Sequence, residues 1–217
     1  MKGLILKDFM NLKKNVKIFA VLLVIYGFMG ITSGDGSFFS VIFTILVAIL
    51  TLSIYSYDEL VHWDTYALTL PVSRDSMVQE KYIMMILLTL IGVIIGGVFA
   101  LIMYFTGGTV NVLSSVQSCA AGAAVAILFY SIIIPFVIKL GVEKSRILLF
   151  AIYIIPFVIV VLVQKAMKAG TFRIQPAVID FVETLIKYAY VIVPVVLIIV
   201  LLISYTISVS IYRKKEF

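Results

Sequence analysis

The chain has 217 residues, of which 63% are hydrophobic and only 13% are charged. Its mean hydropathy of +1.21 excludes a soluble globular domain, in which about a quarter of the residues carry charge, and intrinsic disorder, which needs low hydrophobicity. The formal net charge of +6 then indicates contact with the anionic cytoplasmic surface of a membrane rather than with nucleic acid. We therefore predict an all-α integral membrane protein that forms a single domain over residues 1–217.

The first 17 residues predict a helix that lies in the membrane interface. On a helical wheel they present one apolar face, formed by Ile5, Phe9, Leu12 and Val16. The lysines, including Lys13 and Lys14, lie away from this face, as expected for a helix whose cations contact lipid phosphates. A basic leader that only sets the topology is the alternative. We expect no cleavage here, because no small-x-small site follows.

Six uncharged stretches predict membrane-spanning helices, since a crossing takes about 20 mostly apolar residues. They cover residues 18–34, 37–57, 82–105, 112–138, 147–164 and 188–212. The third and fourth belong to one uncharged run over 82–138, which is too long for a single crossing. We expect this run to turn back near Gly107 and Gly108, because paired glycines interrupt helices.

The distribution of lysine and arginine predicts the orientation of the chain. With the N-terminus inside, 13 of these residues fall in cytoplasmic segments and four fall outside. Positive charge gathers on the cytoplasmic side of membrane proteins, so both termini are expected to be cytoplasmic. Residues 165–187 are then the longest external connection, and the helical spacing of their apolar residues predicts an external loop that contains a helix.

Small residues recur every four positions in the third and fourth predicted spans. They are Gly92, Gly96 and Ala100 in the third, and Ser118, Gly122 and Ala126 in the fourth. Such faces let helices approach closely. Because the loop between these two spans is the shortest, we expect the two faces to pack against each other; a dimer contact is the alternative.

Residues 58–81 form the one large cytoplasmic loop, and its charge is opposite to that of the other cytoplasmic segments. It carries five acids and two bases. Pro71 interrupts it, and Ser73 or Ser76 can cap a new helix. Ser76 with Gln79 fits a capping box. We therefore predict a short helix, an extended turn and a second helix that continues into the third span.

This acidic loop also holds Trp63, the only tryptophan of the chain, beside His62 and Tyr66. Its acids are repelled by anionic lipid, so the loop is expected to point away from the membrane. A structured, acidic and aromatic loop is typical of a docking element for a cytoplasmic protein. The alternative is a solvated loop in which Trp63 is an ordinary interfacial anchor.

The predicted spans contain no Asp, Glu, Lys, Arg or His. A proton-driven carrier usually has such a group at mid-membrane, so this composition argues against one. His62 is the only histidine, and no phosphate-binding loop is present. We expect no catalytic residue, no metal site and no cofactor site in this chain, and an energy source in a partner.

Four segments together resemble the bacterial ABC-2-type permeases, the small six-span membrane subunits of ATP-driven exporters. The segments are residues 2–14, the Leu-Pro-Val-Ser-Arg loop with Glu-Lys-Tyr after it at 70–82, residues 136–146, and the tail 208–217. The likeness covers nearly the whole chain, although each motif is short. Within the family, the chain resembles in particular the permeases that export phenol-soluble modulins, which are amphipathic peptides.

The resemblance implies an interfacial elbow helix, supplied by residues 1–17, and a coupling helix in the loop 58–81 that docks on an ATPase. The coupling candidates at these positions are Asp58, Glu59, His62, Trp63, Asp64 and Tyr66, with Arg74, Glu143 and Lys144 as secondary candidates. It also implies a second permease subunit, either a copy of this chain or a related one.

Further implications of the resemblance concern the activity. ATP and magnesium bind the partner ATPase rather than this chain, and the complex exports hydrophobic or amphipathic cargo (peptides, toxins or lipids) across the bacterial cell membrane. An ATP-independent channel or carrier is the alternative function. A membrane immunity or structural protein is a third interpretation.

Overall fold

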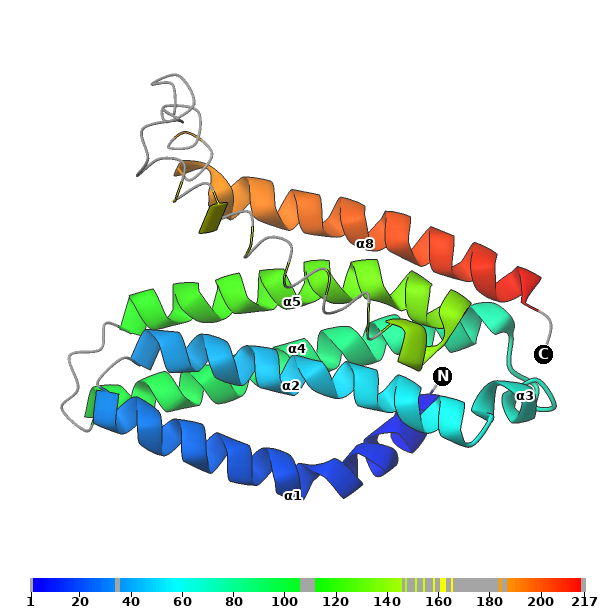
Figure 1. Cartoon of the computed structure of the whole chain (residues 1–217), viewed down its shortest axis with the longest axis horizontal. Coiled ribbons are helices and arrows are strands. Elements are labelled where there is room, and N and C mark those ends of the chain that lie inside the picture. Colours follow the sequence, from blue (N-terminus) through cyan, green and yellow to red (C-terminus); the bar gives the residue numbers. More distant parts are fainter. Residues whose placement is uncertain are drawn as a thin grey trace.

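The computed structural model describes residues 2–33, 36–105, 112–145 and 188–215, with single residues between 147 and 187. All regular structure within these ranges is helical. Figure 1 shows long helices lying side by side in a bundle, with one short helix at an end of it. Both chain termini lie at that same end.

Five long helices make up the described bundle. They are α1 (Lys2–Ser33), α2 (Gly36–Leu60), α4 (Arg74–Phe105), α5 (Val112–Leu140) and α8 (Ala189–Lys214), and the short helix is α3 (Trp63–Ala67). Each long helix is long and apolar enough to cross a membrane, so the chain is a multi-pass membrane protein. The predicted sixth span at 147–164, the external segment 165–187 and the turn at 106–111 lie outside the continuously described ranges.

The two longest helices extend furthest beyond the hydrocarbon core of a bilayer. α1 and α4 each have 32 residues, which is about 48 Å of helix against a hydrocarbon core of about 30 Å. The uncharged part of α4 begins at Tyr82. Its first two turns, which include Glu80 and Lys81, therefore lie outside the membrane-spanning segment.

The structure differs from the prediction of a separate helix over residues 1–17. These residues form the first half of the continuous α1, and Figure 1 shows this half leaning toward α2 and α4. Leu4, Asp8 and Leu12 lie on its buried face. No glycine or proline occurs between Gly3 and Gly27, so nothing in this stretch interrupts the helix.

α2 is the central helix and contacts α1, α3, α4 and α5. A Cβ atom on Gly96 of α4 would lie 2.7 Å from the Ser40 carbonyl oxygen of α2, and one on Gly92 would lie 2.8 Å from the Thr44 carbonyl oxygen. The Ser40 hydroxyl also donates a hydrogen bond to the Gly96 carbonyl over 3.1 Å. The two backbones can approach this closely only because the α4 residues are glycines.

The prediction that the two small-residue faces pack on each other is therefore wrong in its main part. Gly122 of α5 also faces α2, where a Cβ atom would lie 3.3 Å from Val41. Gly96 does approach α5, since its Cβ atom would lie 2.9 Å from the Cys119 sulfur. The physical reason is that α2 presents small polar side chains, such as Ser40, to both neighbours and so occupies the seam between them.

α8 lies along the outside of α5 (Figure 1) and also contacts α4. Its buried residues are Ser204, Ser208 and Tyr212, which recur every four positions and so form one polar stripe. The Tyr82 hydroxyl of α4 lies 2.6 Å from the Ser204 hydroxyl and 2.8 Å from that of Ser208. Hydrogen bonds between hydroxyls thus hold α8 to the bundle, together with the packing of Leu201, Val209 and Ile211 against the core. Most of its other large apolar side chains are exposed, as lipid requires.

Candidate functional site

The short helix α3 projects from the end of the bundle that carries both termini (Figure 1). α2 ends at Leu60, and His62 takes a left-handed backbone conformation with φ of 49°, which histidine tolerates better than most residues do. The His62 carbonyl then accepts hydrogen bonds from the amides of Thr65 and Tyr66. The chain therefore changes direction after α2, and α3 begins directly after His62.

The predicted order of short helix, turn and longer helix is confirmed in this segment. α4 begins at Arg74, and the Ser76 amide donates to the Ser73 hydroxyl over 3.2 Å. Ser73 is therefore the N-cap of α4. The predicted capping box of Ser76 with Gln79 is wrong, because Ser76 already lies in the first turn of the helix.

Contacts with two other helices hold α3 in place. The Asp64 carboxylate accepts a hydrogen bond from the Tyr212 hydroxyl of α8 over 3.1 Å, and its other oxygen lies 3.8 Å from Lys215 Nζ. On the opposite side, Lys7 Nζ of α1 lies 4.4 Å from the Trp63 ring centre, within the range of a cation–π contact. Both chain ends are thus attached to the same short helix.

The end of α2 is also attached to the turn that follows α5. A Glu59 oxygen accepts a hydrogen bond from the Val142 amide over 2.6 Å. Gly141 before it has a positive φ of 83°, and a Cβ atom there would lie 2.7 Å from the other Glu59 oxygen. Glycine therefore meets both the backbone conformation and the close approach at this position.

Five charged side chains form a buried group beneath α3, which we call the ion cluster: Lys7, Asp8, Asp58, Glu80 and Lys81. Lys7 Nζ lies 2.7 Å from Asp58 and 2.8 Å from Asp8, and Lys81 Nζ lies 3.0 Å from Asp8. Lys81 also bonds to Asp58. These pairs join α1, α2 and α4 at one point.

The acids of the ion cluster are almost completely removed from solvent. Asp8 is 0%, Glu80 is 1% and Asp58 is 6% exposed. Burial and then a hydrogen bond with Asp8 raise the pKa of Glu80 to about 8. Burial alone would raise the pKa of Asp8, but the hydrogen bond with Glu80 and the charges of Lys81 and Lys7 outweigh it and lower that pKa. At neutral pH, Glu80 is therefore the acid that keeps its proton.

A second, exposed set of contacts connects the start of α4 with the end of α8. Arg213 forms a two-point ion pair with Asp75, and its carbonyl accepts a hydrogen bond from Arg74 Nη1 over 2.5 Å. The hydrogen bond from Arg213 holds the pKa of Asp75 below its usual value. Exposed pairs of this kind add little stability, but they orient the chain end beside α3.

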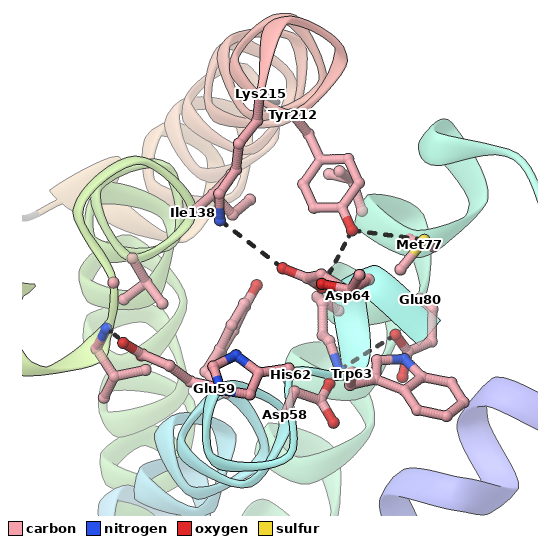
Figure 2. Close-up of a pocket in the computed structure, with 17 residues that line it drawn as sticks. Asp58, Glu59, His62, Trp63, Asp64, Met77, Glu80, Ile138, Tyr212 and Lys215 are labelled. Carbon is pink, nitrogen blue, oxygen red and sulfur yellow. Dashed lines mark hydrogen bonds and ion pairs between the residues drawn. The ribbon is translucent and has the colours of Figure 1, made fainter. Parts of the chain in front are cut away.

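A cavity of about 190 Å³ opens between α3 and the ends of the surrounding helices, and we call it the end pocket. Figure 2 shows Glu59, Asp64, Tyr212 and Lys215 around it. Its floor is buried and includes Tyr55, Glu80 and Lys81, whereas Glu59 and His62 are exposed at its rim. Its lining comes from α2, α3, α4, α5, α8 and the turn after α5.

Most residues predicted for coupling lie around this pocket. Asp58, Glu59, His62, Trp63 and Asp64 line it. Tyr66 is exposed on α3 beside Trp63, with 5.5 Å between the ring centres, and Arg74 bonds to the chain end. Glu143 and Lys144 are exposed on the helical turn after Gly141. Asp58 differs from the others in that two lysines hold it in the interior.

The residues predicted for the membrane interface are divided between two environments. Leu12 is buried in the bundle against α2 and α4, and Ile5 is partly buried beside it. Phe9 and Val16 are exposed, as are Lys13 and Lys14. The inward face of the first half of α1 thus follows Leu4, Asp8 and Leu12, one turn apart from each other.

Sequence reasoning missed Lys7, Asp8, Glu80, Lys81 and Tyr212 as members of this site. Asp8 offered a signal, because it is the only acid among the lysines of the first 17 residues. Within the described ranges, no three His, Cys, Asp or Glu side chains are grouped as metal ligands would be.

Comparison with known proteins adds one finding. A family model described as "ABC-2 family transporter protein" matches residues 3–213. No curated protein and no solved structure matches the chain.

Proposed function

Because the chain belongs to the ABC-2 family of transporter proteins, we propose that it is the permease subunit of an ATP-driven exporter in the bacterial cell membrane. The match over 3–213 confirms the resemblance noted in the sequence and carries this proposal. ATP hydrolysis takes place in a separate cytoplasmic ATPase, and magnesium is bound there too. Both termini and α3 face the cytoplasm, in keeping with the 13 lysines and arginines assigned to that side.

In this proposal α3 is the element on which the ATPase acts. It lies at the extreme end of the bundle, and Tyr66 is 58% exposed on it. The hydrogen bond between Asp64 and Tyr212 attaches it to α8, and the contact between Trp63 and Lys7 attaches it to α1. A displacement of α3 is therefore transmitted to the first and the last helix of the described bundle, which shifts the permease between states.

The cargo proposed is hydrophobic or amphipathic, such as a peptide, a toxin or a lipid. The uncharged run over 82–138 supplies two membrane-spanning segments without a fixed charge, and a pathway along them suits such a cargo better than an ion. Two copies of this chain, or this chain with a related permease, form the complete pathway. We expect two ATPase subunits with them.

The test is purification of the tagged full-length protein from native membranes in mild detergent, with ATP hydrolysis assayed in the eluate. We expect a near-stoichiometric cytoplasmic ATPase. Replacement of the exposed Tyr66 by alanine should release it, whereas the matched variant Gln79→Ala, exposed on α4, should retain it. Equal recovery of the ATPase with both variants would show that α3 is not part of the docking surface.

A clean eluate would contradict the exporter, provided that known transporter complexes survive the same conditions. Flux through liposomes that contain this chain alone would then indicate an ATP-independent channel or carrier. The absence of both the ATPase and the flux would indicate an immunity or structural protein.

A further inference from the structure

The end pocket has a charge that is opposite to that of the molecule as a whole. Three carboxylates line it, on Asp58, Glu59 and Asp64, with the protonated acid Glu80 and two ammonium groups, on Lys81 and Lys215. Lys81 is bonded to Asp58 and Asp8 inside the ion cluster. An acidic cavity in a chain of net charge +6 disfavours an anionic lipid headgroup as its occupant.

At the rim, the negative charge exceeds the positive charge. Glu59 accepts one backbone hydrogen bond from Val142, which leaves its charge uncompensated by any cation in the described contacts. Asp64 has Lys215 as its nearest described ammonium group, at 3.8 Å. Two carboxylates therefore face one ammonium group, and a further cation at this rim is electrostatically favoured.

The floor of the end pocket adds a polar group that points to a ligand. Among the described residues, the Tyr55 hydroxyl is buried and has no hydrogen-bond partner. Tyr55 lines the pocket. A buried hydroxyl without a partner costs free energy, so a ligand that donates a hydrogen bond to it from inside the pocket recovers that cost.

We infer that the end pocket binds the guanidinium or ammonium group of an arginine or lysine side chain presented by the cytoplasmic partner. The cavity of about 190 Å³ accommodates one such group with part of its stem. A guanidinium offers several donors in a plane, enough for Glu59, Asp64 and the Tyr55 hydroxyl together. The occupant comes from the cytoplasmic side because the exposed rim residues, Glu59, His62 and Thr65, belong to the end of α2 and to α3. This inference rests on the proposed function for the identity of the partner.

The first experiment uses the purified full-length chain and the probe N-acetyl-arginine amide, with N-acetyl-citrulline amide as its uncharged counterpart. Trp63 lines the pocket and is the only tryptophan, so its fluorescence reports occupancy. We expect the arginine probe to bind at least about tenfold more tightly than the citrulline probe, which corresponds to about 1.4 kcal/mol. An equal response to both probes would overturn the inference.

Matched variants distinguish binding of the probe in the end pocket from binding on the surface around it. Glu59→Gln and Tyr55→Phe should each weaken binding of the arginine probe severalfold. Gln79→Ala alters an exposed polar side chain of α4 outside the pocket lining, and Tyr190→Phe alters an exposed tyrosine of α8; both variants should bind the arginine probe as the native chain does. Unchanged binding in both pocket variants, with folding verified by size-exclusion chromatography, would place the probe elsewhere.

The second experiment tests the source of the cation. The arginine probe, at saturation, should displace the ATPase captured by the native chain, and the citrulline probe should not. Probe binding without displacement would show that the pocket holds a free cationic solute instead of a partner side chain. If no ATPase is captured at all, the proposed function fails, and the fluorescence measurement still decides whether the pocket binds a cation.

Discussion

The protonation state of Glu80 determines the net charge of the ion cluster. Two lysines, Lys7 and Lys81, face three carboxyl groups that are almost inaccessible to water. Burying an uncompensated charge costs several kcal/mol. A proton on Glu80, whose pKa burial raises to about 8, leaves two carboxylates for two ammonium groups. The cluster therefore balances its own charge at neutral pH without a further partner.

The proton on Glu80 makes stability depend on pH. An acid whose pKa rises on folding, here from 4.5 to about 8, binds a proton in the folded state that the unfolded state has already released. The contribution of Glu80 to folding stability is then complete below about pH 4.5 and is lost as pH rises through about 8. We predict that the thermal unfolding midpoint of the purified protein declines over this window.

Glu80→Gln mimics the protonated acid and should flatten that decline. Glu143→Gln, at an exposed carboxylate outside the cluster, should keep the native slope. The measurement is thermal unfolding in detergent across the pH range. A Glu80→Gln protein with the native slope would assign the pH dependence to another group.

At the scale of elements, the glycines of α4 determine how closely it approaches α2. A Cβ atom on Gly96 would lie 2.7 Å from the Ser40 carbonyl oxygen and 2.9 Å from the Cys119 sulfur, whereas one on Gly97 would meet no atom within 4 Å. Gly96→Ala should therefore destabilise the protein by about 1–3 kcal/mol. Gly97→Ala, the neighbouring control on the same helix, should be neutral or stabilising by up to about 1 kcal/mol.

Comparison of the two alanine variants by thermal or denaturant unfolding checks this prediction. The same change is made one residue apart, so helix propensity and composition are matched. Equal free energies of unfolding for the two variants would mean that α2 and α4 can move apart without loss of stability. The glycine face of α4 would then not be needed for its contact with α2.

The individual helices could be predicted from the sequence better than the packing of each helix against the others. Uncharged runs bounded by Asp58, Lys81 and Lys139 indicate where helices cross, because burying charge in lipid is unfavourable. The break around Pro71 likewise indicated α3 and the turn after it. Helical periodicity shows which face of a helix is small or apolar, but it does not identify the helix that covers that face. This is why the central place of α2 was missed.

Only part of the candidate site was predicted, because the sequence indicates the residues of one loop but not the distant residues that pack against it. Acids and aromatics in the loop 58–81 pointed to Glu59, His62 and Trp63, which line the end pocket. The partners supplied by α1 and α8, such as Lys7 and Tyr212, are distant in the sequence. Their lysines and tyrosines resemble ordinary interfacial residues until the fold brings them together.

For the whole molecule, the hydrogen bond between Tyr212 and Asp64 connects α3, the proposed docking helix, with α8. Tyr212→Phe removes this bond and keeps the ring in place. For the proposed exporter, we predict that the variant still captures the ATPase, that the resulting complex still hydrolyses ATP, and that cargo exported per ATP falls severalfold. Transport in reconstituted vesicles, measured together with ATP hydrolysis, checks the ratio.

Tyr190→Phe is the control for that experiment, since Tyr190 is 75% exposed on the same helix. It should leave both quantities unchanged. A native ratio of transport to hydrolysis in Tyr212→Phe would show that movement of α3 reaches the bundle by another route, such as the contact between Trp63 and Lys7.

The balance of the ion cluster also has an electrical consequence. A unit charge that crosses the full membrane potential gains or loses about 2.3 kcal/mol per 100 mV. Two ammonium groups, two carboxylates and one neutral acid carry no net charge, and Glu80 and Lys81 lie outside the membrane-spanning segment, so the membrane potential exerts no net force on the junction of α1, α2 and α4. Rearrangement of this junction is therefore expected to be electrically silent.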